Sequence, residues 1–116
     1  MTDRCIYHIT TLIDWQNALT RGGYRIGSLE SEGFIHASTY DQGLGTAQAH
    51  FAGQKGLVLL KINTEHLLPE VKYEPAQNGT LFPHIFGEIN LEAVEQVTRF
   101  VADADGVFRT IGDEHA

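Results

Sequence analysis

The chain has 116 residues, of which 42% are hydrophobic and 20% charged, so the composition fits one globular domain over residues 1–116 and excludes a disordered chain. The formal net charge of −7 argues against binding to nucleic acid or to an anionic membrane, because both need a basic face. A single cysteine, Cys5, excludes an internal disulfide, and no apolar run fits a membrane span or a signal peptide. We therefore expect a cytoplasmic protein.

The chain begins with a predicted strand and a predicted helix. Residues 5–10 alternate between two faces, as a strand does. Thr11, followed three residues later by Asp14, forms a variant of the capping box and predicts the start of a helix, which the glycine at position 22 ends. The apolar stripe that we expect to face the core comprises Leu12, Trp15 and Leu19.

A second strand and a second helix are predicted after an irregular arm. The arm covers residues 24–32, and the strand covers residues 34–38. Thr39 and Gln42 form another capping pair, which predicts a helix that ends at Gly53.

The middle of the chain predicts strands joined by tight turns. Residues 56–62 are apolar on both faces, which indicates a central strand covered on two sides. A helical turn capped by Asn63 should follow. Two extended segments then flank Asn78 and Gly79, a pair that favours a tight hairpin turn with positive φ.

The last part of the sequence completes an α+β pattern. Residues 91–101 predict a short helical turn followed by a strand, and residues 107–111 predict a final extended piece. Strands and helices do not repeat as βαβ units, so we expect a mixed or antiparallel central sheet with two main helices.

Histidine is the most informative residue type in this sequence, with six copies. Three of them lie inside predicted strands and between apolar neighbours: His8 in "IYHIT", His36 in "FIHAS" and His84 in "FPHIF". A buried imidazole needs a partner, since an unpaired buried polar group costs roughly 1–3 kcal/mol. The other three are expected at the surface or in the polar tail and are His50, His66 and His115.

Each strand histidine is accompanied by a second polar side chain. By alternation, Phe82 and Phe86 flank the third histidine and make its face dry, while Pro83 predicts an edge or a bend there. We expect the first two histidine strands to lie in one sheet and their rings to reach one cavity. The expected same-face pairs are His8 with Thr10, His36 with Ser38, and His84 with Glu88.

Three kinds of chemistry are compatible with such a group of histidines. A metal site would gather ligands from separate strands, because no compact metal-binding spacing is present. Nucleophilic catalysis would use Cys5, which lacks the helix N-terminus that activates a thiol, so we expect an inert buried thiol. The third is a polar cleft in which neutral imidazoles and hydroxyls bind a nucleotide. Histidines with only a structural role are the remaining alternative.

Several spaced motifs make the sequence resemble a known family. The segments "IYHITT", "GGYR", "SLESEGFIHAST", "GLVLLKI" and "NGTLFPHIFGEI" are similar to the bacterial family labelled domain of unknown function 952. That family resembles the ADP-ribosyltransferase superfamily, especially the catalytic lobe of the NAD-dependent RNA 2′-phosphotransferases. The resemblance implies an ADP-ribosylation-like fold and NAD as a cofactor.

The resemblance also implies roles for individual residues. The first histidine strand would contact the nicotinamide end of NAD, and the second would lie near its ribose and phosphates. The third would stabilise a developing cation or orient an acceptor. The implied cofactor-binding residues are His8, Thr10, Arg25, His36 and Ser38, and the implied catalytic residues are His8, His36, His84 and Glu88.

The sequence therefore predicts a domain that binds NAD or an ADP-ribose-containing nucleotide in a histidine-lined cleft and transfers ADP-ribose to an unknown acceptor. The acidic charge and the lack of room for an RNA-gripping lobe make nucleic acid an improbable partner. Two alternatives stay open: a binding or sensing module of the same fold without chemistry, and a histidine-ligated metal site.

Overall fold

The computed structural model describes residues 4–100, and these form short helices and antiparallel strands. The predicted α+β class is confirmed, whereas the extended piece expected at residues 107–111 and the histidine at 115 lie outside the described residues. No helix of residues 4–100 is long and apolar enough to cross a membrane. The elements are β1 (Cys5–Thr11), α1 (Leu12–Arg21), β2 (Gly23–Tyr24), α2 (Gly27–Ser31), β3 (Ile35–His36), α3 (Gly43–Phe51), β4 (Leu57–Asn63), β5 (Val71–Pro75), β6 (Leu81–Ile85), β7 (Ile89–Asn90), the 3₁₀ turn η1 (Leu91–Ala93) and β8 (Val94–Phe100).

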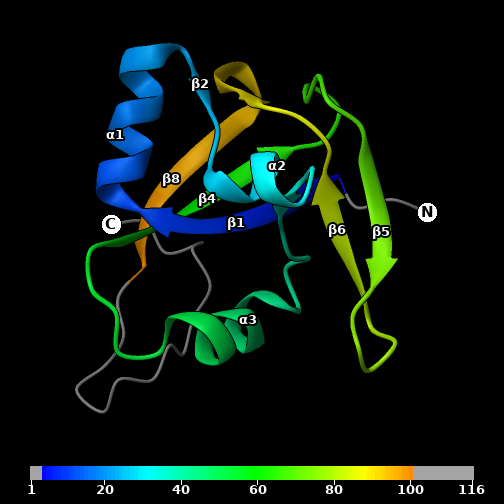
Figure 1. The fold of residues 1–116 in the computed structure, drawn as a ribbon. Coiled ribbons are helices and arrows are strands. Elements are labelled where there is room, and N and C mark those ends of the chain that lie inside the picture. The colour runs from blue at the N-terminus through cyan, green and yellow to red at the C-terminus, as the bar shows by residue number, and fades with distance from the viewer. Residues whose placement is uncertain (1–3, 101–116) are drawn as a thin grey trace.

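The strands pair into three small antiparallel sheets. The largest has the order β1-β4-β8, a second contains β3-β6-β5, and the third contains only β2 and β7. Figure 1 shows β1, β4 and β8 running together across the molecule, with the β5–β6 hairpin to one side. The first two sheets meet at one β-bridge, between Tyr7 and Ser38.

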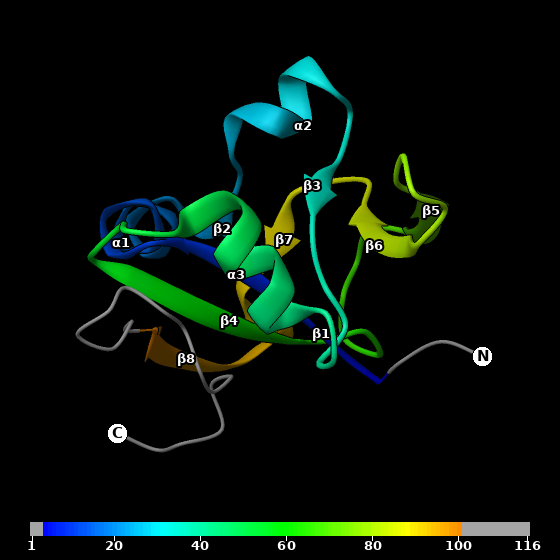
Figure 2. The same cartoon turned by 90° about the horizontal axis from the view of Figure 1, so that it is seen from below.

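Strand β4 is the central strand of the largest sheet, as its apolar sequence predicts. Its side chains alternate between two apolar clusters. Val58 and Leu60 pack with Trp15 of α1 on one face, whereas Leu57 and Leu59 pack with the α3 side on the other. Figures 1 and 2 show the two helices on opposite sides of this sheet. The cleft described below therefore lies along β1, whose other edge pairs with this strand.

Helix α1 begins and ends where the sequence predicts, but it buries a different face. The backbone N–H of Asp14 donates to the Thr11 hydroxyl at 3.1 Å, and Gly22 ends the helix with φ +91°. The expected stripe is wrong in part, because Leu12 is 43% and Leu19 53% exposed. The residues that α1 buries are Trp15 and Ala18.

The segment expected to be an irregular arm contains regular structure. Residues 23–24 form β2 and residues 27–31 form α2, a five-residue helix without a side-chain cap. Of the second expected capping pair, one contact forms: the Gln42 side chain accepts from the Thr39 N–H at 3.0 Å. Helix α3 then starts at Gly43.

The β5–β6 hairpin confirms one turn prediction and corrects another. Gly79 has φ +86°, the left-handed conformation that a tight turn requires and that glycine adopts at little cost. Pro83, by contrast, lies in the central strand of its sheet and not at an edge. The Pro83 carbonyl accepts from the Ala37 N–H at 3.0 Å. The regular pairing of β3 with β6 ends at the pair of His36 and His84, so the missing N–H of proline costs no regular ladder bond.

Candidate functional site

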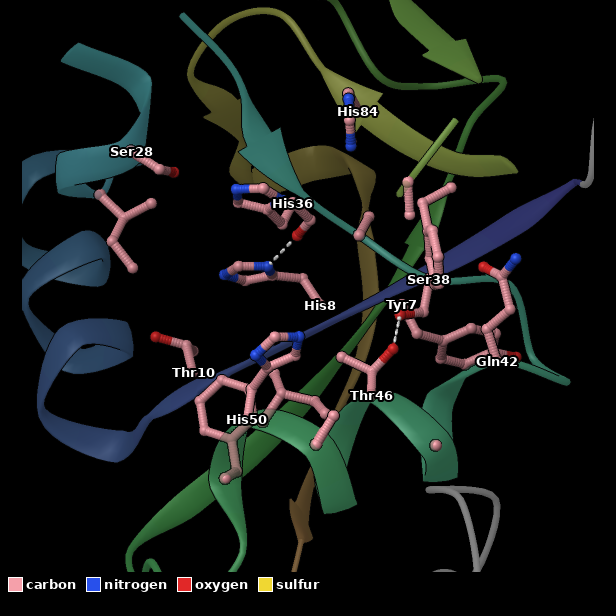
Figure 3. Close-up of a pocket in the computed structure, with 18 of the residues that line it drawn as sticks. Tyr7, His8, Thr10, Ser28, His36, Ser38, Gln42, Thr46, His50 and His84 are labelled. Carbon is pink, nitrogen blue, oxygen red and sulfur yellow. Dashed lines mark hydrogen bonds between the residues drawn. The ribbon is translucent and has the colours of Figure 1, made fainter. Parts of the chain in front are cut away.

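A cleft of about 1020 Å³ lies along one edge of β1. Its walls come from β1, the start of α2, β3, α3 and the β5–β6 hairpin, and Figure 3 shows side chains from these elements pointing into it. Histidines from four different elements line it, together with hydroxyl and amide side chains. Among these polar residues are His8, Thr10, Ser28, His36, Ser38, Gln42, Thr46, His50 and His84.

The cleft follows the edge of β1 that does not face β4. On the β4 side, the Leu12 N–H donates to the Gly56 carbonyl at 2.8 Å, so even-numbered residues of this segment point their backbone groups toward β4. Tyr7 points the other way and exchanges two hydrogen bonds with Ser38, at 2.7 and 2.8 Å. Because backbone direction alternates along a strand, the N–H and C=O of Ile9 face the cleft side of β1.

The imidazole of His8 occupies the place where β1 and β3 separate. After the Tyr7–Ser38 pair, a regular antiparallel ladder would next join Ile9 to His36. Instead, the His8 ring donates from Nδ1 to the His36 carbonyl at 2.5 Å. A side chain thus replaces a backbone bond, and the replacement leaves the cleft open between the two strands.

The other ring nitrogen of His8 belongs to a buried polar chain. The Tyr24 hydroxyl lies 2.8 Å from His8 Nε2 and 2.8 Å from Thr10 Oγ1. Since a carbonyl only accepts, Nδ1 carries the proton, and the neutral ring accepts the Tyr24 proton at Nε2 while Thr10 donates to the tyrosine oxygen. Burial lowers the pKa of His8 to about 4 and raises the pKa of Tyr24 to about 12, so both groups are neutral at pH 7.

His36 and His84 lie at the rim of the cleft and each faces a carboxylate. Their ring centroids are 5.3 Å apart in an edge-to-face arrangement. His84 Nδ1 donates to Glu74 Oε1 at 2.7 Å, whereas His36 Nε2 lies 3.3 Å from Glu32. As the sequence predicts, His8, His36 and His84 all line one cleft. The strands of His8 and His36, however, belong to two sheets joined by a bridge, not to one sheet.

Two of the expected site residues lie elsewhere. Arg25 and Glu88 form an ion pair at 3.7 Å outside the cleft lining, and Arg25 also pairs with Glu30 at 3.4 Å. The prediction that Glu88 shares the face of His84 is wrong, because β6 ends at Ile85 and the alternation does not continue past it. Thr10 and Ser38 do line the cleft, both with buried hydroxyls.

Sequence reasoning missed several polar residues in or beside the cleft. His50 is exposed, as expected, but it also lines the cleft from α3 one turn after Thr46, whose hydroxyl lies 2.9 Å from that of Ser38. The four-residue spacing of Thr46 and His50 is a signal for a shared helical face. Tyr24 was missed because it follows two glycines in a segment with no clear periodicity.

The residues described give no support to the two alternative chemistries. No group of three or more histidine, cysteine, aspartate or glutamate side chains within residues 4–100 is arranged to hold a metal ion. Burial, together with the nearby Glu95 carboxylate, raises the pKa of the Cys5 thiol, which is opposite to the change that activates a nucleophilic cysteine.

Comparison with known proteins places these observations in a family. A family model described as "Protein of unknown function (DUF952)" matches residues 9–97. The crystal structure of protein CC0527 from Caulobacter crescentus is similar, with a TM-score of 0.82 and 33% identity over 90% of this chain and 93% of that one. The solution structure of CC0527 gives a TM-score of 0.80 and 32% identity over 92% of this chain and 93% of that one. No curated protein matches the sequence.

Proposed function

The chain belongs to the DUF952 family of proteins of unknown function, and we propose that its cleft binds NAD or another nucleotide that contains ADP-ribose. The proposal joins the geometry of the cleft to the resemblance between the sequence motifs and the ADP-ribosyltransferase superfamily. In this proposal the nicotinamide end lies against β1, and the adjoining ribose lies among the histidines.

The observation that carries this proposal is the backbone of Ile9. Its N–H and C=O both face the cleft, and they present a donor and an acceptor side by side on the open edge of a strand. A primary carboxamide such as that of nicotinamide presents the complementary acceptor and donor. His8 and Thr10, on either side of Ile9, are fixed through Tyr24 and hold this part of the strand in place.

The size and the polar groups of the cleft suit a sugar and a base. Its volume of about 1020 Å³ is at the upper end of the range for small-molecule sites. The histidine, threonine and glutamine side chains at its walls are donors and acceptors suited to the hydroxyls of a sugar. No lysine or arginine among the described residues lines the cleft, and Arg25, the expected partner of the pyrophosphate, is held by two glutamates. We therefore assign the pyrophosphate to the open side of the cleft.

The positions of the acidic side chains favour binding of the nucleotide without transfer of ADP-ribose. Breaking the bond between nicotinamide and ribose passes through an oxocarbenium-like state, which a nearby carboxylate stabilises. Glu88, the expected carboxylate, lies outside the cleft, and the acidic residues that line it within the described chain are Asp14 and Asp41. Transfer of ADP-ribose is the second candidate, and it would depend on these aspartates.

The test combines ligand binding with turnover. Isothermal titration and thermal shift with NAD, ADP-ribose and nicotinamide should show stabilisation, which is about 2.7 kcal/mol for a ligand at 100 times its Kd. Nicotinic acid adenine dinucleotide, in which a carboxylate replaces the carboxamide, should bind about tenfold more weakly, because it has no donor for the Ile9 carbonyl. Equal affinity for the two dinucleotides would contradict the role given to Ile9. Release of nicotinamide, followed by chromatography, separates transfer from binding.

A blocking variant provides the structural control. Gly45 lines the cleft from α3, and a Cβ built on it meets no atom within 4 Å. Gly45→Phe should therefore fill the cleft and abolish NAD binding without straining the backbone. Gly45→Ala adds only a methyl group, and it should keep binding while raising helix stability by about 0.5–1 kcal/mol. Undiminished binding by Gly45→Phe would place the ligand elsewhere.

A further inference from the structure

A carboxylate on β5 fixes the orientation of one cleft histidine. Glu74 Oε1 accepts from His84 Nδ1 at 2.7 Å across the β5–β6 hairpin. The Glu74 carboxylate only accepts, so this hydrogen bond places the ring proton on Nδ1 and leaves Nε2 of the neutral ring as an acceptor.

Aromatic contacts hold the same ring in place. The Phe34 ring stacks on His84 with centroids 4.0 Å apart and an angle of 12° between the planes, and the His36 ring meets it at 5.3 Å. The His84 side chain is only 14% exposed. A ring held by a hydrogen bond, a stacked ring and a second imidazole has one orientation, which is what a binding site needs from its polar groups.

The remaining nitrogen of this ring is open to the cleft. Within residues 4–100, no buried side-chain nitrogen or oxygen lacks a hydrogen-bond partner. His84 Nε2 makes no such bond in this part of the chain, so it is accessible, and His84 lines the cleft. Figure 3 shows the ring above the space that His8 and His36 border.

We propose that Glu74 and His84 form a carboxylate–imidazole pair whose Nε2 accepts a hydrogen bond from a sugar hydroxyl of the ligand. Glu74 is then a positioning residue that acts through the ring, and His84 selects ligands that carry a hydroxyl at this point. This inference rests on the proposed function, since it names the group of the nucleotide that His84 recognises.

A second histidine–glutamate pair borders the cleft, but its contact is weaker than that of Glu74 and His84. His36 and Glu32 are 3.3 Å apart, and their side chains are 57% and 49% exposed, so water competes with that contact. The Glu74–His84 bond is shorter, and one partner is largely buried, which makes it the stronger of the two.

The first arm of the test needs no ligand. Nitrogen-15 NMR of the imidazole at pH 8 should show His84 as the Nδ1–H tautomer in the wild type and in Glu74→Gln, whose amide oxygen still accepts. Glu74→Leu should give a mixture of tautomers. Glu70→Leu removes the same charge one residue before β5, at an exposed position, and should leave the tautomer unchanged. A mixture of tautomers in the wild type would overturn the pair.

The second arm measures titrations of NAD into the same variants. Glu74→Leu and His84→Phe should each weaken binding about tenfold, their combination should weaken it no further, and Glu74→Gln should stay within about threefold of the wild type. Glu70→Leu is again the control. Equal affinity of Glu74→Leu and Glu70→Leu would overturn the inference. Absence of NAD binding by the wild type would overturn the proposed function and the hydroxyl contact with it, whatever the tautomer of His84.

Discussion

The histidines of this protein occupy two contrasting environments within one cleft. His8 is 7% exposed and has both ring nitrogens bonded to protein groups, whereas the His36 side chain is 57% exposed and has a surface glutamate as its polar partner. The first ring connects strands and depends on burial. The second connects the protein to whatever enters the cleft, and its removal should leave the fold intact.

The difference separates a structural role from a binding role in one site. A buried neutral imidazole with two partners contributes to folding, because its removal leaves other buried groups without a bond. An exposed imidazole whose polar contact is loose contributes less to folding, so its presence there is better explained by a ligand. His84 combines both situations, with one nitrogen bonded and the other open.

The largest expected effect is that of His8→Ala. The change removes a buried ring, leaves the His36 carbonyl without its partner and leaves the Tyr24 hydroxyl with Thr10 alone. We expect the free energy of unfolding to fall by roughly 3–5 kcal/mol. Urea denaturation at pH 7.5 measures this directly. A loss below about 1 kcal/mol would show that His8 does not tie the strands together.

A pH titration should give the next largest effect. The pKa of His8 falls from 6.5 to about 4 on folding, because burial disfavours the charged ring. Above pH 6.5 this group leaves stability unchanged. Between pH 6.5 and about 4 the unfolded chain binds the proton and the folded one does not, so stability falls by about 3 kcal/mol. Denaturation of the wild type and of His8→Gln at pH 7, 5.5 and 4.5 should show a steeper decline in the wild type; parallel declines would contradict it.

Tyr24→Phe should have a smaller effect on the same network. The variant keeps the buried ring but removes the hydroxyl that joins His8 to Thr10. We expect a loss of about 1–2 kcal/mol in the free energy of unfolding, the usual cost of leaving buried polar partners unsatisfied. Thermal and urea denaturation measure it, and an unchanged stability would mean that water replaces the hydroxyl.

The smallest effect on stability is expected for His36→Ala, together with a large effect on binding. Its exposed ring, its loose contact with Glu32 and its edge contacts with Phe34 and His84 predict a stability change under about 1 kcal/mol. NAD affinity should nevertheless fall at least about tenfold, because the ring borders the ribose position of the proposed ligand. A stability loss comparable with that of His8→Ala, with binding retained, would remove the contrast between the two histidines.

The parts of the fold that the sequence predicts are those fixed by local chemistry. Thr11 and Gly22 delimit α1 through a hydroxyl and a left-handed backbone, both of which depend on neighbouring residues only. The position of β4 was predictable as well, because a strand that is apolar on both faces must be covered on both faces. Helix α2 could not be predicted, because its five residues have no cap and no apolar stripe.

For the site, alternation within a strand was a good guide and alternation past its end was not. His8 and Thr10 share a buried environment, as their spacing predicts. Glu88 was assigned to the face of His84 by counting through residues 86–88, where the chain leaves β6 and turns toward Arg25. Where a strand ends depends on its partners across the sheet, and those partners are distant in the sequence.

The single bridge between Tyr7 and Ser38 has a kinetic consequence. In the part of the chain that the structure describes, it is the one backbone ladder contact between the sheet of β4 and the sheet of β6. A joint with so few backbone bonds can open without melting either ladder, as a sub-global unit does. In native-state hydrogen exchange, the amides of Tyr7 and Ser38 should therefore exchange sooner than those in the middle of β4. Their exchange rates then record how often the two sheets part at the mouth of the cleft.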